Sequence, residues 1–318
     1  MEEAIKNFNT QFEWKPEIVH GAKLAPARRF ELCGMGGSAL AADLFKIVRP
    51  ELELSVHRDY GLPPRTSKDT LYIADSFSGN TEEALDFATK VQAGGLPLAV
   101  IAKGGALARF ATEHTVPHII LPPADIQPRS GLGYQTLALA AWVSDEKLLE
   151  ELAELSSVLA PETLRGAGQK LANELRSKIP VIYASARNAA VAYNWKIKMN
   201  ETGKIPAFYN VIPELNHNEM TGFDLTPSTE GLSRRLHFIF LSDTEDHPQN
   251  QKRMKVTRGL YTDRGLACTE VALWGHGTLE KIFTSLLIAD WTALYLAGIY
   301  GTEAEQVPMV EEFKRLIA

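Results

Sequence analysis

The octet Asp75–Glu82, with the sequence DSFSGNTE, carries side chains that suit one kind of chemistry. Its hydroxyl groups, on Ser76, Ser78 and Thr81, lie between a short apolar run and a helical pattern. The first backbone N–H groups of a helix have no internal partner and carry the positive end of the helix dipole. Amides, hydroxyls and dipole together can hold a dianionic phosphate group at such a turn. Ordinary helix capping by Ser78 accounts for the same residues, so both interpretations stay open at this point.

A glycine-rich turn forms a second candidate anion site. The segment Gly34–Ser38 reads GMGGS and lies between an apolar run and the helical run Ala39–Ile47. Glycines let backbone N–H groups, such as that of Gly37 beside Ser38, approach a ligand closely. The turn matches neither the dinucleotide fingerprint nor the P-loop, because the third glycine and a Gly-Lys-Ser/Thr sequence are absent. Tight packing of a strand against a helix explains these glycines equally well.

Three further residues have side chains that suit catalysis. Arg129 lies in PRSGLG, where a guanidinium group either contacts an anion or is a solvated charge. Glu201 lies at the C-terminal end of a predicted helix that Gly203 would cap, where the helix dipole disfavours its charged form. It is either a general base or a solvated surface glutamate. His217 lies in the polar segment PELNHNEM without a second histidine at a metal-ligand spacing, so no zinc site is expected.

Short apolar runs alternate with helical patterns through the first half of the chain. Such alternation predicts parallel strands joined by right-handed crossover helices. In such sheets, ligands bind beyond the carboxyl ends of the strands. Both candidate loops follow predicted strands, so we expect them to face one pocket, which favours phosphate binding over simple capping. The expected strands are Phe30–Cys33, Leu52–Val56, Thr70–Ala74, Leu96–Ala102 and Val116–Leu121.

The second half repeats this pattern without the glycines. A helical segment, Asp145–Ala172 with a break at Pro161, is expected to join the two halves. The loop Ser185–Asn188, which follows the first strand of the second half, lacks glycine. We therefore expect two copies of one α/β design, of which only the first keeps the phosphate-loop features. The expected strands are Val181–Ala184, Leu236–Leu241 and Leu266–Leu273, and the expected helices are Gln251–Leu260, Leu279–Ala297 and Val307–Ile317.

Composition limits the class of protein and its partners. The chain has 318 residues, 45% of them hydrophobic and 23% charged, with a net charge of −6, which is typical of a soluble two-domain protein. The chain has no basic run, so nucleic acid is not expected as a partner. The N-terminus shows no apolar core or cleavage signal, so no signal sequence is expected. The apolar stretch Leu286–Tyr300 contains Asp290 and is expected to fall short of a membrane span. Cys33 and Cys268 form neither a disulfide framework nor a metal cluster, so we expect a cytoplasmic protein.

Four segments together resemble one family. The segments GMGGS, SFSGNTE, NETGK and PELNHNE occur in the order found in the bifunctional phosphoglucose/phosphomannose isomerases, which are built from two sugar-isomerase (SIS) domains. The Ser-Gly-Asn-Thr loop is shared by many SIS proteins, whereas the segments with Glu201 and His217 are narrower signals. The resemblance implies an α/β protein of two SIS domains, each a parallel-sheet α-β-α sandwich, followed by a C-terminal tail helix. The implied ranges are 1–152, 153–300 and 301–318.

The resemblance also implies a reaction and a role for each candidate residue. The reaction interconverts glucose 6-phosphate, and mannose 6-phosphate, with fructose 6-phosphate through a cis-enediolate, without a metal or other cofactor. The protein would be a homodimer in which the partner subunit supplies the ring-opening histidine. The implied phosphate-binding residues are Gly37, Ser38, Ser76, Ser78 and Thr81, and the implied catalytic residues are Arg129 (enediolate stabilisation), Glu201 (base), His217 (ring opening) and Lys314 (assistance at the ring oxygen).

One departure from the family leaves the substrate preference open. Before the tail lysine, the family carries a threonine or glutamine linked to accepting mannose or only glucose substrates. This chain has Gln306 and Val307 there. Two alternatives to the isomerase also stay open: a non-catalytic sugar-phosphate sensor, and an aminosugar-phosphate isomerase or deaminase of the SIS class. A sensor needs the phosphate anchor but not the base, arginine and histidine together.

Overall fold

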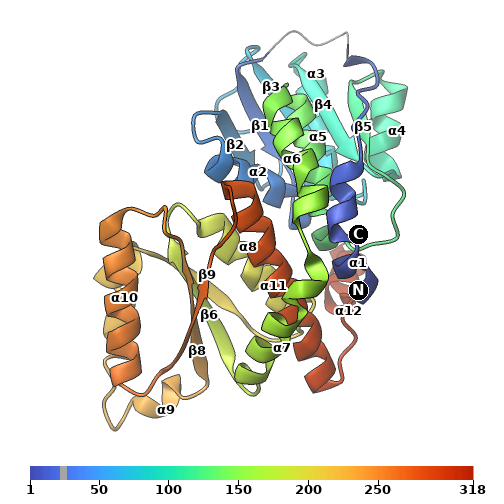
Figure 1. Cartoon of the computed structure of the whole chain (residues 1–318). Helices are drawn as coiled ribbons and strands as arrows, with labels where there is room; N and C mark the ends of the chain where they lie inside the picture. Colours follow the sequence, from blue (N-terminus) through green and yellow to red (C-terminus); the bar gives the residue numbers. More distant parts are fainter. Residues whose placement is uncertain (22–26, 318) are drawn as a thin grey trace. The chain divides into compact units, whose positions relative to one another are not determined.

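The computed structural model describes residues 1–21 and 27–317. The chain forms two compact units. The N-terminal unit is Asn7–Leu159, and the C-terminal unit comprises Met1–Lys6 together with Ala160–Ala318. The short first helix, α1 (Glu2–Lys6), thus belongs to the C-terminal unit. Figure 1 labels the elements of both units.

A sheet of five parallel strands, in the order β2-β1-β3-β4-β5, lies at the centre of the N-terminal unit. The five strands predicted from the apolar runs are confirmed, with their ends shifted by one or two residues. Their buried runs, such as the fully buried β4, are what a parallel sheet covered on both faces requires. The strands are β1 (Arg29–Cys33), β2 (Glu53–His57), β3 (Thr70–Ser76), β4 (Leu98–Ala102) and β5 (His118–Ile120).

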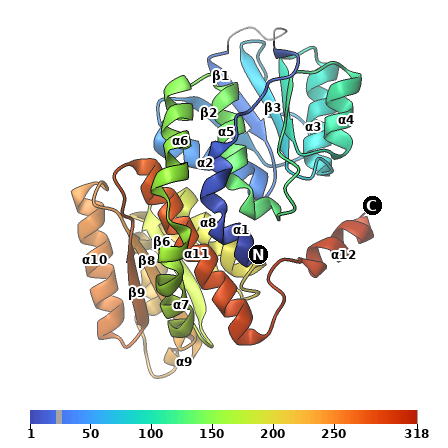
Figure 2. The same cartoon turned by 45° about the vertical axis from the view of Figure 1, so that its right-hand side comes forward.

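Helices cover both faces of this sheet (Figures 1 and 2). On one face, α3 (Glu82–Ala93) and α4 (Gly105–Glu113) pack on side chains of the strands. The helix α3 buries Ala84, Phe87, Ala88 and Val91, which recur at helical spacing and form its apolar stripe. The other face carries α2 (Gly37–Val48), α5 (Leu132–Trp142) and α6 (Glu146–Val158); the 3-10 helices are η1 (Phe8–Glu13) and η3 (Pro128–Ser130).

The C-terminal unit contains a second parallel sheet, in the order β7-β6-β8-β9. This order repeats that of β2-β1-β3-β4, which confirms the prediction of two copies of one design. The strands are β6 (Ile179–Ser185), β7 (Phe208–Ile212), β8 (Leu236–Ser242) and β9 (Ala267–Ala272). The edge strand β7 was not among the strands expected from the sequence.

One helix, α10 (Pro248–Asp263), covers one face of this second sheet. The other face carries α7 (Arg165–Glu174), α8 (Ala189–Glu201) and α11 (Thr278–Tyr300). The tail helix α12 (Pro308–Ile317) follows, as predicted. The short helices are η4 (Pro161–Leu164), η5 (Glu214–His217), η6 (Glu219–Phe223) and α9 (Glu230–Ser233).

The helix α11 corrects one expectation. It has 23 residues, so by length and composition alone it could cross a membrane, and the prediction that its apolar stretch is too short for a span is wrong. Yet 78% of its apolar window is buried inside the protein, as for the core helix of a globular unit. Within this core, Asp290 accepts a hydrogen bond from Lys198 of α8 at 2.7 Å, so α8 and α11 are joined by a buried ion pair.

Candidate active site

Hydrogen bonds of the Ser76 side chain and the backbone conformation of Gly79 fix the shape of the turn between β3 and α3. The fully buried Ser76 hydroxyl oxygen accepts the N–H of Gly79 at 3.0 Å and lies 2.8 Å from the hydroxyl of Thr81. Gly79 has φ +71°, and a Cβ there would lie 1.7 Å from the carbonyl oxygen of Gly104, so only glycine fits. The exposed hydroxyl of the turn is that of Ser78.

The side chain of Ser38 joins the glycine-rich turn to this loop. Its buried hydroxyl oxygen accepts the N–H of Phe77 at 2.9 Å and a side-chain N–H of Gln135 at 2.9 Å. Ser38 and Ser76 thus direct their hydroxyls into the framework of the loops, whereas Ser78 and Thr81 keep exposed surface. Of the four residues that carry the predicted hydroxyls, Ser38 and Ser76 are buried, Thr81 is half-buried and Ser78 is exposed.

Glycines also bring the segment of Arg129 against these loops. A Cβ at Gly37 would lie 3.0 Å from the carbonyl of Pro128 and 3.1 Å from the backbone nitrogen of Arg129. A Cβ at Gly131 would lie 2.4 Å from the ring of Phe77. Arg129 itself is 2% exposed. The N-terminal unit therefore brings all the predicted phosphate-binding residues and the arginine into neighbouring segments.

A buried carboxyl group lies at the end of β3, beside this set. Asp75 is fully buried, and burial raises its pKa well above the usual range, although hydrogen bonds with Ser38 and Gln135 oppose the shift. Within the described residues, Oδ2 of Asp75 and Oε1 of Gln135 find no hydrogen-bond partner. The raised pKa favours the neutral form of this carboxyl, beneath the turn predicted to bind phosphate. Neither residue has a sequence-based assignment, although a polar side chain inside an apolar run was a usable signal.

Glu201 is the last residue of α8 and is half-buried, which confirms its predicted place at a helix C-terminus. The prediction that Gly203 caps this helix is wrong. The cap residue is Thr202, and the left-handed conformation is taken by Lys204, with φ +56°. Gly203 is needed for space instead, because a Cβ there would lie 2.9 Å from the carbonyl oxygen of Met199.

His217 is exposed at the end of η5, and residues before and after it in sequence are held by hydrogen bonds. On one side, Asn216 donates a hydrogen bond to the Thr257 hydroxyl at 2.7 Å. On the other, the carboxylate of Glu219 accepts hydrogen bonds from Tyr183 and from the Asn210 amide. The backbone at His217 is thus held by the C-terminal unit while its imidazole stays open to a ligand.

Lys314 lies on α12, whose side chains are all exposed, and its Nζ is 2.8 Å from a carboxylate oxygen of Glu311. The described structure therefore divides the predicted catalytic set between the units. Arg129 lies with the phosphate loops in the N-terminal unit, whereas Glu201, His217 and Lys314 lie in the C-terminal unit.

Comparison with known proteins places this arrangement in a family. Residues 165–317 match the family model described as bacterial phospho-glucose isomerase C-terminal SIS domain. A relative from Caldicellulosiruptor bescii, named bifunctional phosphoglucose/phosphomannose isomerase, is 31% identical over 100% of this chain and 99% of the relative. The chain belongs to the bifunctional phosphoglucose/phosphomannose isomerase family. A relative of the same name from Aquifex aeolicus is 30% identical over 98% of this chain and 96% of its own.

Solved structures support the fold of this family member. A hypothetical protein from Thermus thermophilus superposes with a TM-score of 0.73 at 18% identity, over 99% of this chain and 87% of that one. A glucosamine-6-phosphate deaminase from Thermotoga maritima superposes with a TM-score of 0.67 at 14% identity, over 96% of this chain and 95% of that one. At these identities the likeness shows the fold alone, which is the predicted pair of SIS domains.

In this phosphoglucose/phosphomannose isomerase family member, the second copy of the strand-end loop carries acidic residues. After β8, the carboxylates of Asp243 and Glu245 accept hydrogen bonds from Lys281 at 3.1 and 2.6 Å. Burial alone would raise the pKa of Asp243, but hydrogen bonds from the Glu245 amide, Asn188 and Lys281 outweigh it and lower the pKa. These carboxylates pair with Lys281 and also with Arg187, so the cations at this loop are already bound to side chains of the protein, unlike the hydroxyl-rich counterpart in the N-terminal unit.

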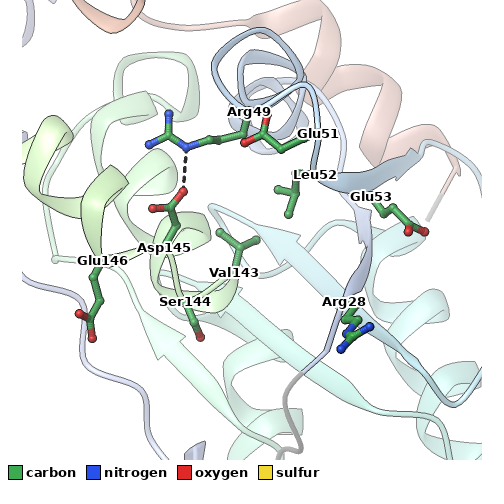
Figure 3. A pocket seen from close by; sticks show the side chains of 9 residues that line it. All are labelled: Arg28, Arg49, Glu51, Leu52, Glu53, Val143, Ser144, Asp145 and Glu146. Carbon is green, nitrogen blue, oxygen red and sulfur yellow. Dashed lines mark hydrogen bonds and ion pairs between the residues drawn. The ribbon is translucent and has the colours of Figure 1, made fainter.

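A cavity of about 530 Å³ in the N-terminal unit lies away from the predicted site (Figure 3). Arg28 and Glu53, at the beginnings of β1 and β2, line it, so it opens at the end of the strands opposite to the phosphate loops. Two of its lining residues form an ion pair, in which Nε of Arg49 donates a hydrogen bond to Asp145 at 2.8 Å. None of the predicted site residues lines this cavity.

Residues 1–21 and 27–317 contain no group of three or more His, Cys, Asp or Glu side chains placed to hold a metal ion.

Proposed function

We propose that this chain is an aldose–ketose isomerase that interconverts glucose 6-phosphate, and mannose 6-phosphate, with fructose 6-phosphate. The observation that carries this function is the full-length match to relatives named bifunctional phosphoglucose/phosphomannose isomerase. The built turn at the end of β3 supports it, because it offers hydroxyls and helix N-terminal amides to a phosphate group. A sensor without catalysis is not favoured, because the base, arginine and histidine segments are all retained.

The phosphate anchor is assigned to the N-terminal unit. The exposed Ser78 and the half-buried Thr81 contact the phosphate through their hydroxyls, together with the amide of Gly37. Ser38 and Ser76 act by holding the loops in the binding shape. Binding energy from the phosphate, which is remote from the reacting carbons, then serves to place C1 and C2 of the sugar beside the base.

The chemistry is a proton transfer along two carbons. His217, supplied by the partner subunit of a homodimer, and Lys314 open the sugar ring by moving protons at its oxygens. Glu201 then removes the proton from C2 of the aldose, which gives a cis-enediolate. It returns the proton to C1 while the hydroxyl proton of O2 passes to O1, which yields the ketose. Arg129 stabilises the negative charge of the enediolate oxygen. A base of this kind contributes typically on the order of 10²–10⁴-fold to the rate. No electrons leave the substrate, so the reaction itself requires no redox cofactor.

Coupled assays with three substrates test this function. Glucose 6-phosphate and mannose 6-phosphate should each yield fructose 6-phosphate, and glucosamine 6-phosphate should yield neither fructose 6-phosphate nor ammonia. Turnover of the aminosugar alone would replace the proposal with aminosugar-phosphate chemistry. Binding of all three sugars without turnover would indicate a sensor. The assay with mannose 6-phosphate decides whether this substrate is accepted by a chain that has Gln306 and Val307 near the family's substrate-selecting position.

A further inference from the structure

Lys204 has a backbone conformation that its residue type disfavours. Its φ of +56° lies in the left-handed region, where a Cβ meets steric resistance and glycine is the usual residue. Gly203 stands directly before it but does not take this conformation. Strained backbone at one residue persists where the surrounding structure or the side chain requires it. The lysine side chain is therefore the feature to explain.

The ammonium group of Lys204 joins two segments that are far apart in sequence. Its Nζ donates hydrogen bonds to the carbonyl oxygen of Glu201 and to the carbonyl oxygen of Gln306. The carbonyl of Glu201 belongs to the last turn of α8, where carbonyls have no intrahelical partner. Gln306 precedes the tail helix α12. One side chain thus ties the end of the helix that carries the proposed base to the root of the helix that carries Lys314.

Two further contacts fix the root of the tail. The N-terminal ammonium of Met1 pairs with the carboxylate of Glu305. The carboxylate of Glu303 accepts the N–H of Glu305 at 2.8 Å and the N–H of Gln306 at 2.5 Å. Beyond this root, every described side chain of α12 is exposed, and Figure 2 shows α12 as a separate arm after α11. The direction of the arm therefore depends on how its root is held.

We propose that Lys204 is a positioning residue of the active site, which sets the starting point of the tail helix relative to Glu201 and so delivers Lys314 to the substrate. The inference rests on the proposed function, in which Lys314 acts at the ring oxygen. Lys314 lies six residues beyond Pro308, the first residue of α12, which is about 9 Å along the helix. A tilt of about 20° at the root therefore moves this residue by about 3 Å, more than a hydrogen bond tolerates.

Substitutions at Lys204 separate positioning from stability. Lys204→Met keeps the aliphatic chain without its donors, Lys204→Gly also relieves the left-handed backbone, and Lys204→Arg keeps a donor. We expect kcat with glucose 6-phosphate to fall about 10- to 100-fold in the Met and Gly variants, with KM changed only a few-fold. The Arg variant should keep most of the activity. The Gly variant should match or exceed the wild-type Tm, because glycine adopts this φ freely. A Gly variant with wild-type kcat would overturn the proposal.

A double-mutant cycle tests whether Lys204 acts through the tail. The three proteins to compare with the wild type are Lys204→Met, Lys314→Met and the double variant. If Lys204 serves to place Lys314, its loss should cost less than about twofold in kcat once Lys314 is already absent. Losses that multiply in the double variant, or a Lys314→Met variant with wild-type kcat, would contradict the inference.

Hydrogen exchange gives a readout that does not depend on activity. Lys204→Met should speed exchange of the amides in residues 305–317. Lys196→Met, a change on the same helix α8 at a residue near Tyr193, should not alter exchange there. If the wild type turns over none of the sugar phosphates while Lys204→Met loosens the tail, the proposed function fails and the structural role of Lys204 stands. If the wild type is active and exchange in the tail is unchanged, the inference alone fails.

Discussion

Glu201 is the residue on which the proposed proton transfer depends, because one carboxyl both removes and returns the proton. Glu201→Gln keeps the size of the side chain but removes the base, so kcat should fall by about 10²-fold or more. Because the phosphate anchor lies on other residues, KM should change only a few-fold. Steady-state kinetics with glucose 6-phosphate measures both values. Glu113→Gln is a matched control, since Glu113 also ends a helix but is exposed and has no assigned role. A Glu201→Gln variant with wild-type kcat would remove the assignment.

Asp75 leads to a prediction about stability against pH. Burial raises the pKa of its carboxyl in the folded protein, so between the unfolded and folded pKa values the folded state binds more protons. Stability from this group is therefore present below the unfolded pKa, about 3.9, and is lost as the pH rises through the window up to the folded pKa. Asp75→Asn has no such loss. We expect it to raise the free energy of unfolding at pH 7, with a gain that shrinks as the pH falls towards 4.

Urea unfolding of the Asp75→Asn variant and the wild type between pH 4 and 8 measures this difference. Asp69→Asn, a change at an exposed residue just before the same strand, is the control and should show no comparable trend with pH. A difference between wild type and Asp75→Asn that stays constant across the pH range would show that the ionisation of Asp75 is not its source. The kinetic constants of Asp75→Asn should not follow this dependence of stability on pH, because the side chain lies beside Ser38 and Gln135 and not at the surface of the loop.

The elements show what the sequence can and cannot reveal. The buried strands of both sheets were predictable because a strand covered on both faces must be apolar along its whole length. The strand β7 was not, because it is a sheet edge with the exposed side chains of Phe208 and Tyr209, and it lies between prolines. The end of α8 was also misjudged. A glycine after a helix usually takes the left-handed conformation, but here Gly203 is used for close approach and Lys204 takes that conformation.

The pair Lys198–Asp290, whose side chains are 3% and 6% exposed, joins α8 to α11 in the core. Removing one partner leaves an uncompensated buried charge, which typically destabilises a protein by about 3–5 kcal/mol. Asp290→Leu should therefore lower the free energy of unfolding strongly. The double variant Lys198→Met with Asp290→Leu should recover most of this loss, because neither charge is then left unpaired. Urea unfolding measures both variants.

This pair also bears on Glu201, which lies one turn after Lys198 on the same helix. In the double variant, kcat for glucose 6-phosphate should stay reduced even though most of the free energy of unfolding is recovered. The reason is that an apolar pair restores packing without fixing the helix in one register. A single variant as stable as wild type would show that the pair does not hold α8. Lys147→Met is a suitable control, since the pair that Lys147 forms with Glu151 is exposed and exposed pairs contribute little.

At the scale of the whole molecule, the two units share one strand order but differ in the loops that end their strands. The N-terminal loop could be predicted as a phosphate site because its hydroxyls and glycines are adjacent in sequence. The packing of Gly79 on Gly104, and the hydrogen bond of Gln135 to Ser38, could not, because these partners are distant in sequence. The same holds for the acidic loop of the C-terminal unit, where Asp243 is neutralised by Lys281 from α11.

The assignment of His217 to the partner subunit makes a prediction that only the assembled molecule can test. In a homodimer of this kind, each site takes Glu201 from one chain and His217 from the other. A heterodimer of Glu201→Gln with His217→Ala then has one site with both wild-type residues and one site with neither. Co-expression or mixed refolding of the two inactive variants should restore about a quarter of the wild-type activity, since half of the dimers are mixed.

If Glu201 and His217 of the same chain formed each site, every site in the mixture would lack one residue and no activity would return. The control is a mixture of Glu201→Gln with Arg129→Met. The proposed mechanism gives no exchanged role to Arg129, so both sites of each mixed dimer lack one residue, and this mixture should stay inactive. Light scattering on the same samples should report a dimer. A monomer with full turnover would contradict both the homodimer and the exchange of His217, because a single chain would then supply the complete site.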